Sequence, residues 1–148
     1  MRRNDPLAVL DRYLGTWEIT IQTEGAPWTG GEYVARWVLD GSFVEKTGYL
    51  SSGDHAEAME TTTWMTFDHE EGVYRMWSFM SGGVASEAVA TWNPDDHSMT
   101  EKREDNGMTT IMVTRFVSDE RQEWAMEMTG PDGSIVGSIS GSNRRLKV

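Results

Sequence analysis

The sequence lacks cysteine and is poor in basic residues and in long apolar runs. Because none of the 148 residues is cysteine, disulfide bonds, thiolate metal sites and a cysteine nucleophile are excluded. Lysine and arginine number 13 against 24 acidic residues, and the net charge of −11 argues against nucleic acid or an anionic membrane as partner. No stretch approaches the ~18 apolar residues of a transmembrane helix, and no signal-peptide core follows Arg3. We therefore expect a cytoplasmic protein.

The first fifteen residues have the pattern of one short amphipathic helix. Asp5 suits the N-cap, Pro6 the first helical position and Gly15 the exit from the helix. The apolar residues that would share one face of this helix are Leu7, Leu10 and Leu14. After Gly15 the apolar period changes to two, which is typical of strands.

Turn signals rich in Gly, Asn, Asp and Pro divide the rest of the chain. They leave ten strand-sized segments: 16–24, 31–39, 43–50, 57–67, 73–80, 84–92, 98–104, 108–117, 122–129 and 134–147. No segment between them is long enough for a crossover helix, so the sheet should be antiparallel. Even spacing is typical of a sandwich or a barrel, and uniform hairpins favour the barrel. We predict one all-β domain over residues 1–148, an antiparallel up-and-down barrel of about ten strands with a short N-terminal helix.

Residues 14–18, Leu-Gly-Thr-Trp-Glu, stand where the predicted helix meets the first strand. A Gly-x-Trp at this place, followed by a meander of strands, resembles the calycin superfamily of lipocalins and fatty-acid-binding proteins. The layout most resembles a bacterial calycin-like family, domain of unknown function 1579. The matching pieces are residues 7–18, 40–45, 64–68 and 130–137. The resemblance implies a lipocalin-type barrel in which Arg144, Arg145 or Lys147 lies over the ring of Trp17.

The three histidines, His55, His69 and His97, lie in or beside predicted turns next to acidic residues. Adjacent residues on a strand point to opposite faces, so we interpret these clusters as solvated turn charges rather than metal sites. Nitrobindin-like barrels, a related class, bind haem through a late histidine, and none follows His97 here. The chain also has no nucleophile elbow and no phosphate loop. We expect no metal, no cofactor and no assigned catalytic residue.

Ten methionines and seven tryptophans are the most unusual feature of the composition. Several rows of alternate residues mix Met, Thr and aromatic side chains, and such inward rows would make an adaptable, partly polar cavity lining. A filled core is the alternative interpretation of the same rows. The ligand-binding residues that we predict are Trp37, Glu45, Thr63, Met65, Arg75, Trp77, Met112, Trp124 and Met126.

The orientation of Arg75 and Glu45 stays open at this point. If the row of Arg75 and Trp77 faces inward, Arg75 is an internal cation that needs a partner, and Glu45 could be that partner. The opposite assignment puts the row of Tyr74 and Met76 inside and leaves Arg75 in water. The alternation of residues allows both.

The function that this pattern favours is binding of a small hydrophobic or amphipathic molecule inside the barrel. One alternative is an enzyme of isomerase or decarboxylase type that uses the same cavity. Another is a self-associating barrel with a filled core. Titratable groups that converge in the cavity would favour the enzyme, and the absence of a cavity would favour the filled barrel. The sequence does not identify the ligand, and it leaves open whether the protein is a monomer or a homo-oligomer.

Overall fold

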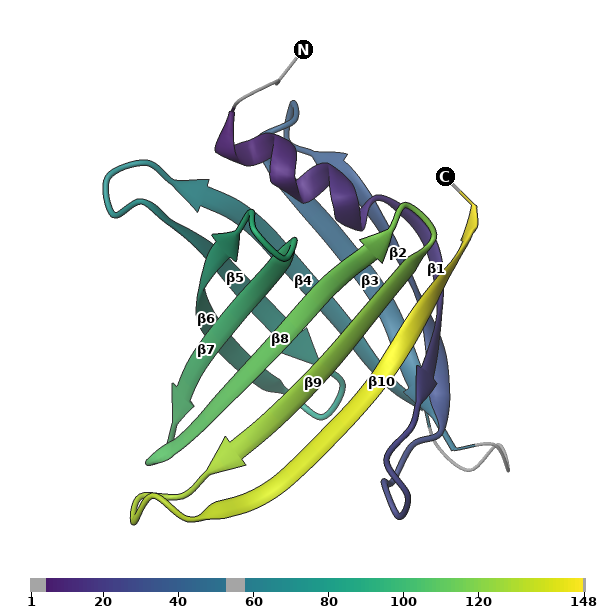
Figure 1. The fold of residues 1–148 in the computed structure, drawn as a ribbon, viewed down its shortest axis with the longest axis vertical. Helices are drawn as coiled ribbons and strands as arrows, with labels where there is room; N and C mark the ends of the chain where they lie inside the picture. The colour runs from purple at the N-terminus through teal and green to yellow at the C-terminus, as the bar shows by residue number, and fades with distance from the viewer. Residues whose placement is uncertain (1–4, 53–57, 148) are drawn as a thin grey trace.

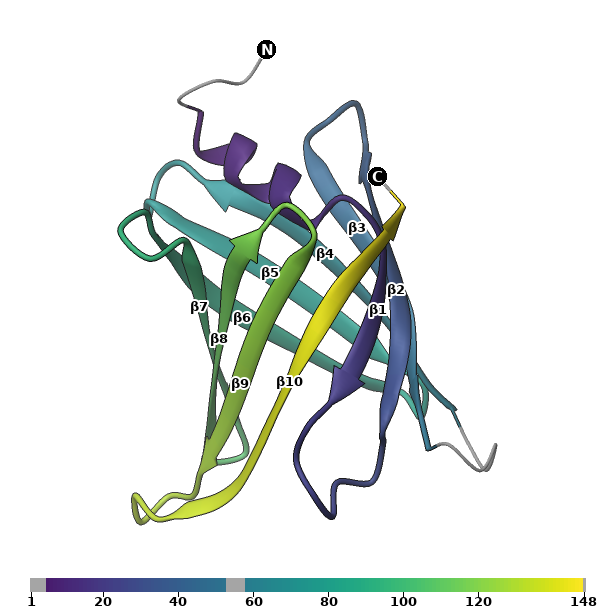
Figure 2. The same ribbon diagram turned by 45° about the vertical axis from the view of Figure 1, so that its right-hand side comes forward.

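The computed structural model describes residues 5–52 and 58–147. Within these ranges ten antiparallel strands form a closed barrel, in which each strand pairs with its neighbours in the chain and β1 closes against β10 (Figure 1 and Figure 2). The strands are β1 (Gly15–Ile21), β2 (Gly30–Val38), β3 (Phe43–Ser51), β4 (Ala58–Asp68), β5 (Val73–Met80), β6 (Val84–Asn93), β7 (Ser98–Asp105), β8 (Met108–Ser118), β9 (Arg121–Thr129) and β10 (Ile135–Lys147). The predicted all-β up-and-down barrel is confirmed, and each predicted segment corresponds to one strand.

The N-terminal helix η1 (Pro6–Tyr13) lies across one end of the barrel, which we call the closed end (Figure 1 and Figure 2). The Asp5 carboxylate accepts a hydrogen bond from the Leu7 amide at 2.9 Å, so the predicted cap is present. The helix is a 3₁₀-helix. Gly15 has a φ of 106°, and this left-handed backbone makes the turn into β1. In the described ranges no helix is long and apolar enough to cross a membrane.

Trp17 is fully buried beneath the helix, at the closed end. Its indole Nε1 donates to the Tyr13 carbonyl at 3.0 Å, and its ring stacks on Tyr33 at a centroid distance of 6.1 Å. The Arg145 guanidinium carbon lies 4.6 Å from the centre of the Trp17 ring. The expected arginine over the indole is therefore present, in a contact that contributes about 0.5–2 kcal/mol.

The strand register decides which face of the sheet is inside. Val44, Met65, Met76 and Ala88 lie opposite one another across β3, β4, β5 and β6, and each is at most 1% exposed. Because side chains alternate along a strand, the neighbouring Arg75 lies on the outer face. The row of Tyr74 and Met76 therefore faces inward, and the row of Arg75 and Trp77 faces outward.

Candidate ligand-binding cavity

A cavity of about 210 Å³ lies inside the barrel. An apolar cavity of about 150 Å³ already holds a benzene molecule. Pockets for drug-sized ligands begin at about 300 Å³. The cavity therefore has the size for one aromatic ring with a short substituent, and the barrel interior is not filled.

Most of the cavity wall is apolar and deformable. Its methionines are Met65, Met76, Met80, Met112 and Met126. Methionine side chains are flexible and polarisable, so this wall can adapt to ligands of different shape. Trp124 adds an indole surface, and the hydroxyls of Thr63 and Ser78 share a hydrogen bond of 2.9 Å in which either can be the donor. Five of the predicted residues thus line the cavity: Thr63, Met65, Met112, Trp124 and Met126.

The predicted tryptophans Trp37 and Trp77 lie elsewhere. Trp37 belongs to the inward row of β2 but packs under the helix, where its Nε1 donates to the Asp11 carboxylate at 2.8 Å. Trp77 is on the outer face of β5, with its ring centre 6.2 Å from that of Phe43. Their expected place in the cavity wall is wrong, because Trp77 has outward parity and Trp37 lies beyond the cavity.

The predicted pair of Glu45 and Arg75 is also outside the cavity. Glu45 accepts from Arg36 Nη2 at 3.2 Å on the outer face. Arg75 Nε donates to Asp68 at 2.8 Å, and its Nη1 lies 3.4 Å from Glu87. Both side chains therefore have outer-face partners, and they do not pair with each other.

The charged groups inside the cavity are ones that the sequence analysis did not select. Lys46, Glu101 and Arg103 all line it. Arg103 Nη2 lies 3.2 Å from Glu101 Oε1, and the exposed fractions of these two side chains are only 22% and 12%. Burial lowers the pKa of the Lys46 ammonium; nearby Glu101 opposes this shift and Arg103 adds to it. The position of Lys46 in the sequence could have indicated its inward orientation, because it stands two residues after buried Val44 and therefore on the same face of the strand.

A directed chain of hydrogen bonds crosses the cavity wall. Trp124 Nε1 donates to Asn143 Oδ1 at 3.0 Å, Asn143 Nδ2 donates to Gln122 Oε1 at 2.7 Å, and Gln122 Nε2 donates to the Tyr33 hydroxyl at 2.8 Å. An indole N–H can only donate, so it fixes the orientation of both amides. The Tyr33 hydroxyl must then accept, and its own proton stays available to a ligand.

Tyr13 supplies a second hydroxyl to the same end of the cavity. Its oxygen is buried and has no hydrogen-bond partner among the described residues. Burial, and secondarily the charge of Glu101, raises the pKa of the Tyr13 phenol well above its ordinary value, so the group is a neutral donor. The ammonium of Lys46 lies 4.4 Å from the centre of the Tyr33 ring and 5.7 Å from that of Tyr13. Three donor groups therefore gather near the closed end.

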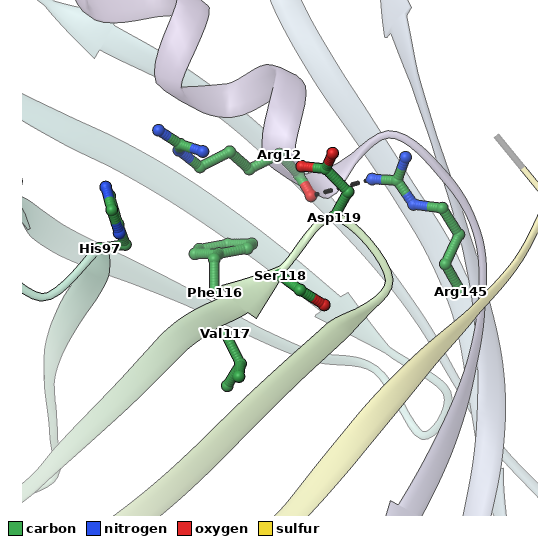
Figure 3. Close-up of a pocket in the computed structure, with 7 residues that line it drawn as sticks. All are labelled: Arg12, His97, Phe116, Val117, Ser118, Asp119 and Arg145. Atoms are coloured by element: carbon green, nitrogen blue, oxygen red, sulfur yellow. Dashed lines mark hydrogen bonds between the residues drawn. The ribbon is translucent and has the colours of Figure 1, made fainter.

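A second pocket, of about 190 Å³, lies at the closed end (Figure 3). Its lining is Arg12, His97, Phe116, Val117, Ser118, Asp119 and Arg145. The guanidinium groups of Arg12 and Arg145 already lie over the rings of Trp92 and Trp17, at 5.0 and 4.6 Å. Figure 3 shows the Asp119 carboxylate between the two arginine side chains. The pocket has mixed charge, and its cations are engaged in closing the barrel.

Two of the histidines lie in aromatic contacts. The ring of His69 meets that of Phe67 at 4.9 Å, and the ring of His97 lies 6.2 Å from that of Trp92. His55 lies outside the described residues. Over the part of the chain that the structure describes, no three histidine or carboxylate side chains are grouped so that they could hold a metal ion.

No protein-family model matches the chain, and no curated protein matches it either. The geometry of the barrel interior therefore carries the functional proposal below.

Proposed function

We propose that the protein binds a small amphipathic molecule inside the barrel, with the polar end of the ligand toward the closed end. The observation that carries the proposal is the combination of a methionine-rich wall with hydroxyl donors that have no acceptor in the described protein. The resemblance of the sequence to calycin barrels also supports ligand binding. On the basis of that resemblance we propose that the protein is calycin-like.

The donors specify the polar end of the ligand. Tyr33 and Tyr13 each offer an O–H, and Lys46 offers an ammonium or an amine, so the ligand should present an acceptor such as a carbonyl or hydroxyl oxygen. A buried donor without a partner costs about 1–3 kcal/mol. A ligand acceptor that satisfies the Tyr13 hydroxyl would recover part of this free energy on binding.

The size of the cavity limits the apolar end. At about 210 Å³ it suits a single ring or a short branched chain. A long-chain fatty acid would need a wider interior. The proposed ligand is therefore small, with its apolar body against Met112 and Trp124 and its acceptor near Tyr33.

The test is a calorimetric titration of the purified protein with benzyl alcohol, benzamide and benzaldehyde, followed in parallel by tryptophan emission. We expect saturable binding and a change in emission, because Trp124 forms part of the wall. Tyr33→Phe should weaken binding by about 2- to 10-fold, which corresponds to the loss of one hydrogen bond of about 0.5–1.5 kcal/mol.

Tyr74→Phe is the matched control, because the Tyr74 hydroxyl donates to the Pro6 carbonyl at 2.6 Å and does not line the cavity. Its affinity should equal that of the wild type. If none of the three compounds binds, the proposal is overturned. Equal effects of Tyr33→Phe and Tyr74→Phe would overturn the proposed orientation of the ligand.

A further inference from the structure

We propose that Lys46 is a nucleophilic amine that forms an imine with a small aldehyde or ketone bound in the cavity. The inference rests on the proposed function, since the carbonyl compound would occupy the same cavity. It also names the ligand class: a compound whose polar end is an electrophilic carbonyl group. If the protein is an enzyme, the alternative considered from the sequence, Lys46 would be its reactive group.

The position of Lys46 supports this role. The residue lies on β3 and lines the cavity together with the neighbouring Gly48. The ion pairs of the described residues do not include Lys46, and Glu101 is paired with Arg103 instead. The amine is therefore in the cavity without a carboxylate bound to it.

Burial, the largest cause of the lowered pKa of Lys46, favours its neutral form. The groups that face it are the rings of Tyr13 and Tyr33, the carboxylate of Glu101 and the guanidinium of Arg103. Burial lowers the pKa of Lys46, Glu101 opposes that effect, and Arg103 adds to it. Desolvation of a lysine in this way is a known means of making its amine nucleophilic.

The chemical step needs no oxidant or reductant. The lone pair of Lys46 Nζ attacks the carbonyl carbon, a C–N bond forms, and the carbonyl π electrons move to the oxygen. The hydroxyl of Tyr33 or Tyr13 can donate a hydrogen bond to that oxygen as negative charge develops on it. Both hydrogens of the amine leave with the oxygen as water, so amine and carbonyl compound give imine and water.

The overall charge of the protein favours a neutral carbonyl compound over an anion. The net charge of −11 repels anions that approach from solution, although salt screens this repulsion beyond about 8 Å. An uncharged aldehyde or ketone meets no such barrier. The carbonyl oxygen of such a compound can accept a hydrogen bond from the tyrosine hydroxyls, and its carbonyl carbon is then near the amine.

The chain suits a direct test, because it contains only three lysines: Lys46, Lys102 and Lys147. The folded protein is incubated at neutral pH with benzaldehyde and sodium cyanoborohydride, which reduces an imine to a stable benzylamine. Intact mass and peptide mapping then locate the benzyl group. We expect more label on Lys46 than on Lys102 and Lys147 together, although Lys102 is 58% exposed.

Competition and variants make the test decisive. An excess of benzyl alcohol, which has no carbonyl group, should suppress labelling of Lys46 but not of Lys102. Lys46→Arg should lose the cavity label, because a guanidinium group forms no imine with benzaldehyde, and it should keep the label on Lys102. Lys102→Arg is the matched control and should keep the Lys46 label.

Two results would overturn the inference: label on the exposed amines without label on Lys46, or labelling of Lys46 that benzyl alcohol does not suppress. Benzyl alcohol binding without imine formation would overturn the inference alone and leave the proposed function standing. Failure of benzyl alcohol, benzamide and benzaldehyde to bind would overturn both.

Discussion

Replacing Trp17 by alanine should lower the free energy of unfolding by about 3–5 kcal/mol, the range for large-to-small changes of an aromatic core residue. A buried aromatic side chain removes about 150–250 Å² from water, and at about 25 cal/mol per Å² this gives about 4–6 kcal/mol for the whole ring. Trp17 is 0% exposed, so all of this area counts. The contacts with Arg145 and Tyr33 are lost as well. We therefore expect a value in the upper part of the range.

The measurement is urea unfolding followed by circular dichroism, because removal of an indole alters the fluorescence signal itself. For a domain of this size, 1 kcal/mol corresponds to about 2–4 °C in Tm, so a loss of 4 kcal/mol should lower Tm by about 8–16 °C. Phe79→Ala is the control, since Phe79 is 51% exposed on the outer face and its loss should stay within about 0.5 kcal/mol. If Trp17→Ala costs no more than this control, Trp17 does not close the barrel.

Three further outcomes can be measured in the same way. Gln122→Leu should destabilise the protein by about 1–3 kcal/mol in urea unfolding, because the amide of Asn143 loses its acceptor and Tyr33 loses a donor. Burial raises the pKa of Tyr74 to about 12 and that of Tyr33 still further, so stability should fall above about pH 10, where the unfolded phenols ionise first; Tyr74→Phe should flatten this fall. Arg75→Met should change stability by less than about 1 kcal/mol, as expected for a surface ion pair, and leave ligand affinity unchanged.

The fold could be predicted because its signals are local and repeated. Each hairpin has its own turn residues, and positive φ occurs where such residues stand, as at Asn106 and Gly107. The helix cap at Asp5 was equally readable, since it depends on a few adjacent residues. The arginine over Trp17 was expected from the resemblance to calycin barrels. The sequence did not indicate that the N-terminal helix is a 3₁₀-helix, because its pitch depends on how it packs on the barrel.

The cavity could be predicted only in part. The prediction for Trp37 was wrong because it faces inward beyond the cavity, whereas the failures at Glu45, Arg75 and Trp77 have one physical cause. A pattern of alternate residues identifies two faces of a strand, but it identifies the inner face only where one row is clearly more apolar than the other. On β9 the row of Trp124 and Met126 alternates with glutamates, so its assignment was correct. On β5 both rows are apolar and aromatic, and only the pairing of Met76 with Met65 across β4 decides between them.

Lys46 shows why a binding site is harder to read than a core. Its strand, β3, carries Glu45 and Lys46 side by side, one on each face, so charge gives no preference for either. Charged residues usually face water, so both Glu45 and Lys46 would be expected on the outside of the barrel. Charged residues that take part in binding or catalysis can instead line a cavity. Register settles the matter, because Lys46 pairs with Thr63 and Ala35 in rows that face inward. A polar group in such a row is unfavourable for packing alone, so its presence supports the proposal that the interior of this barrel binds a ligand.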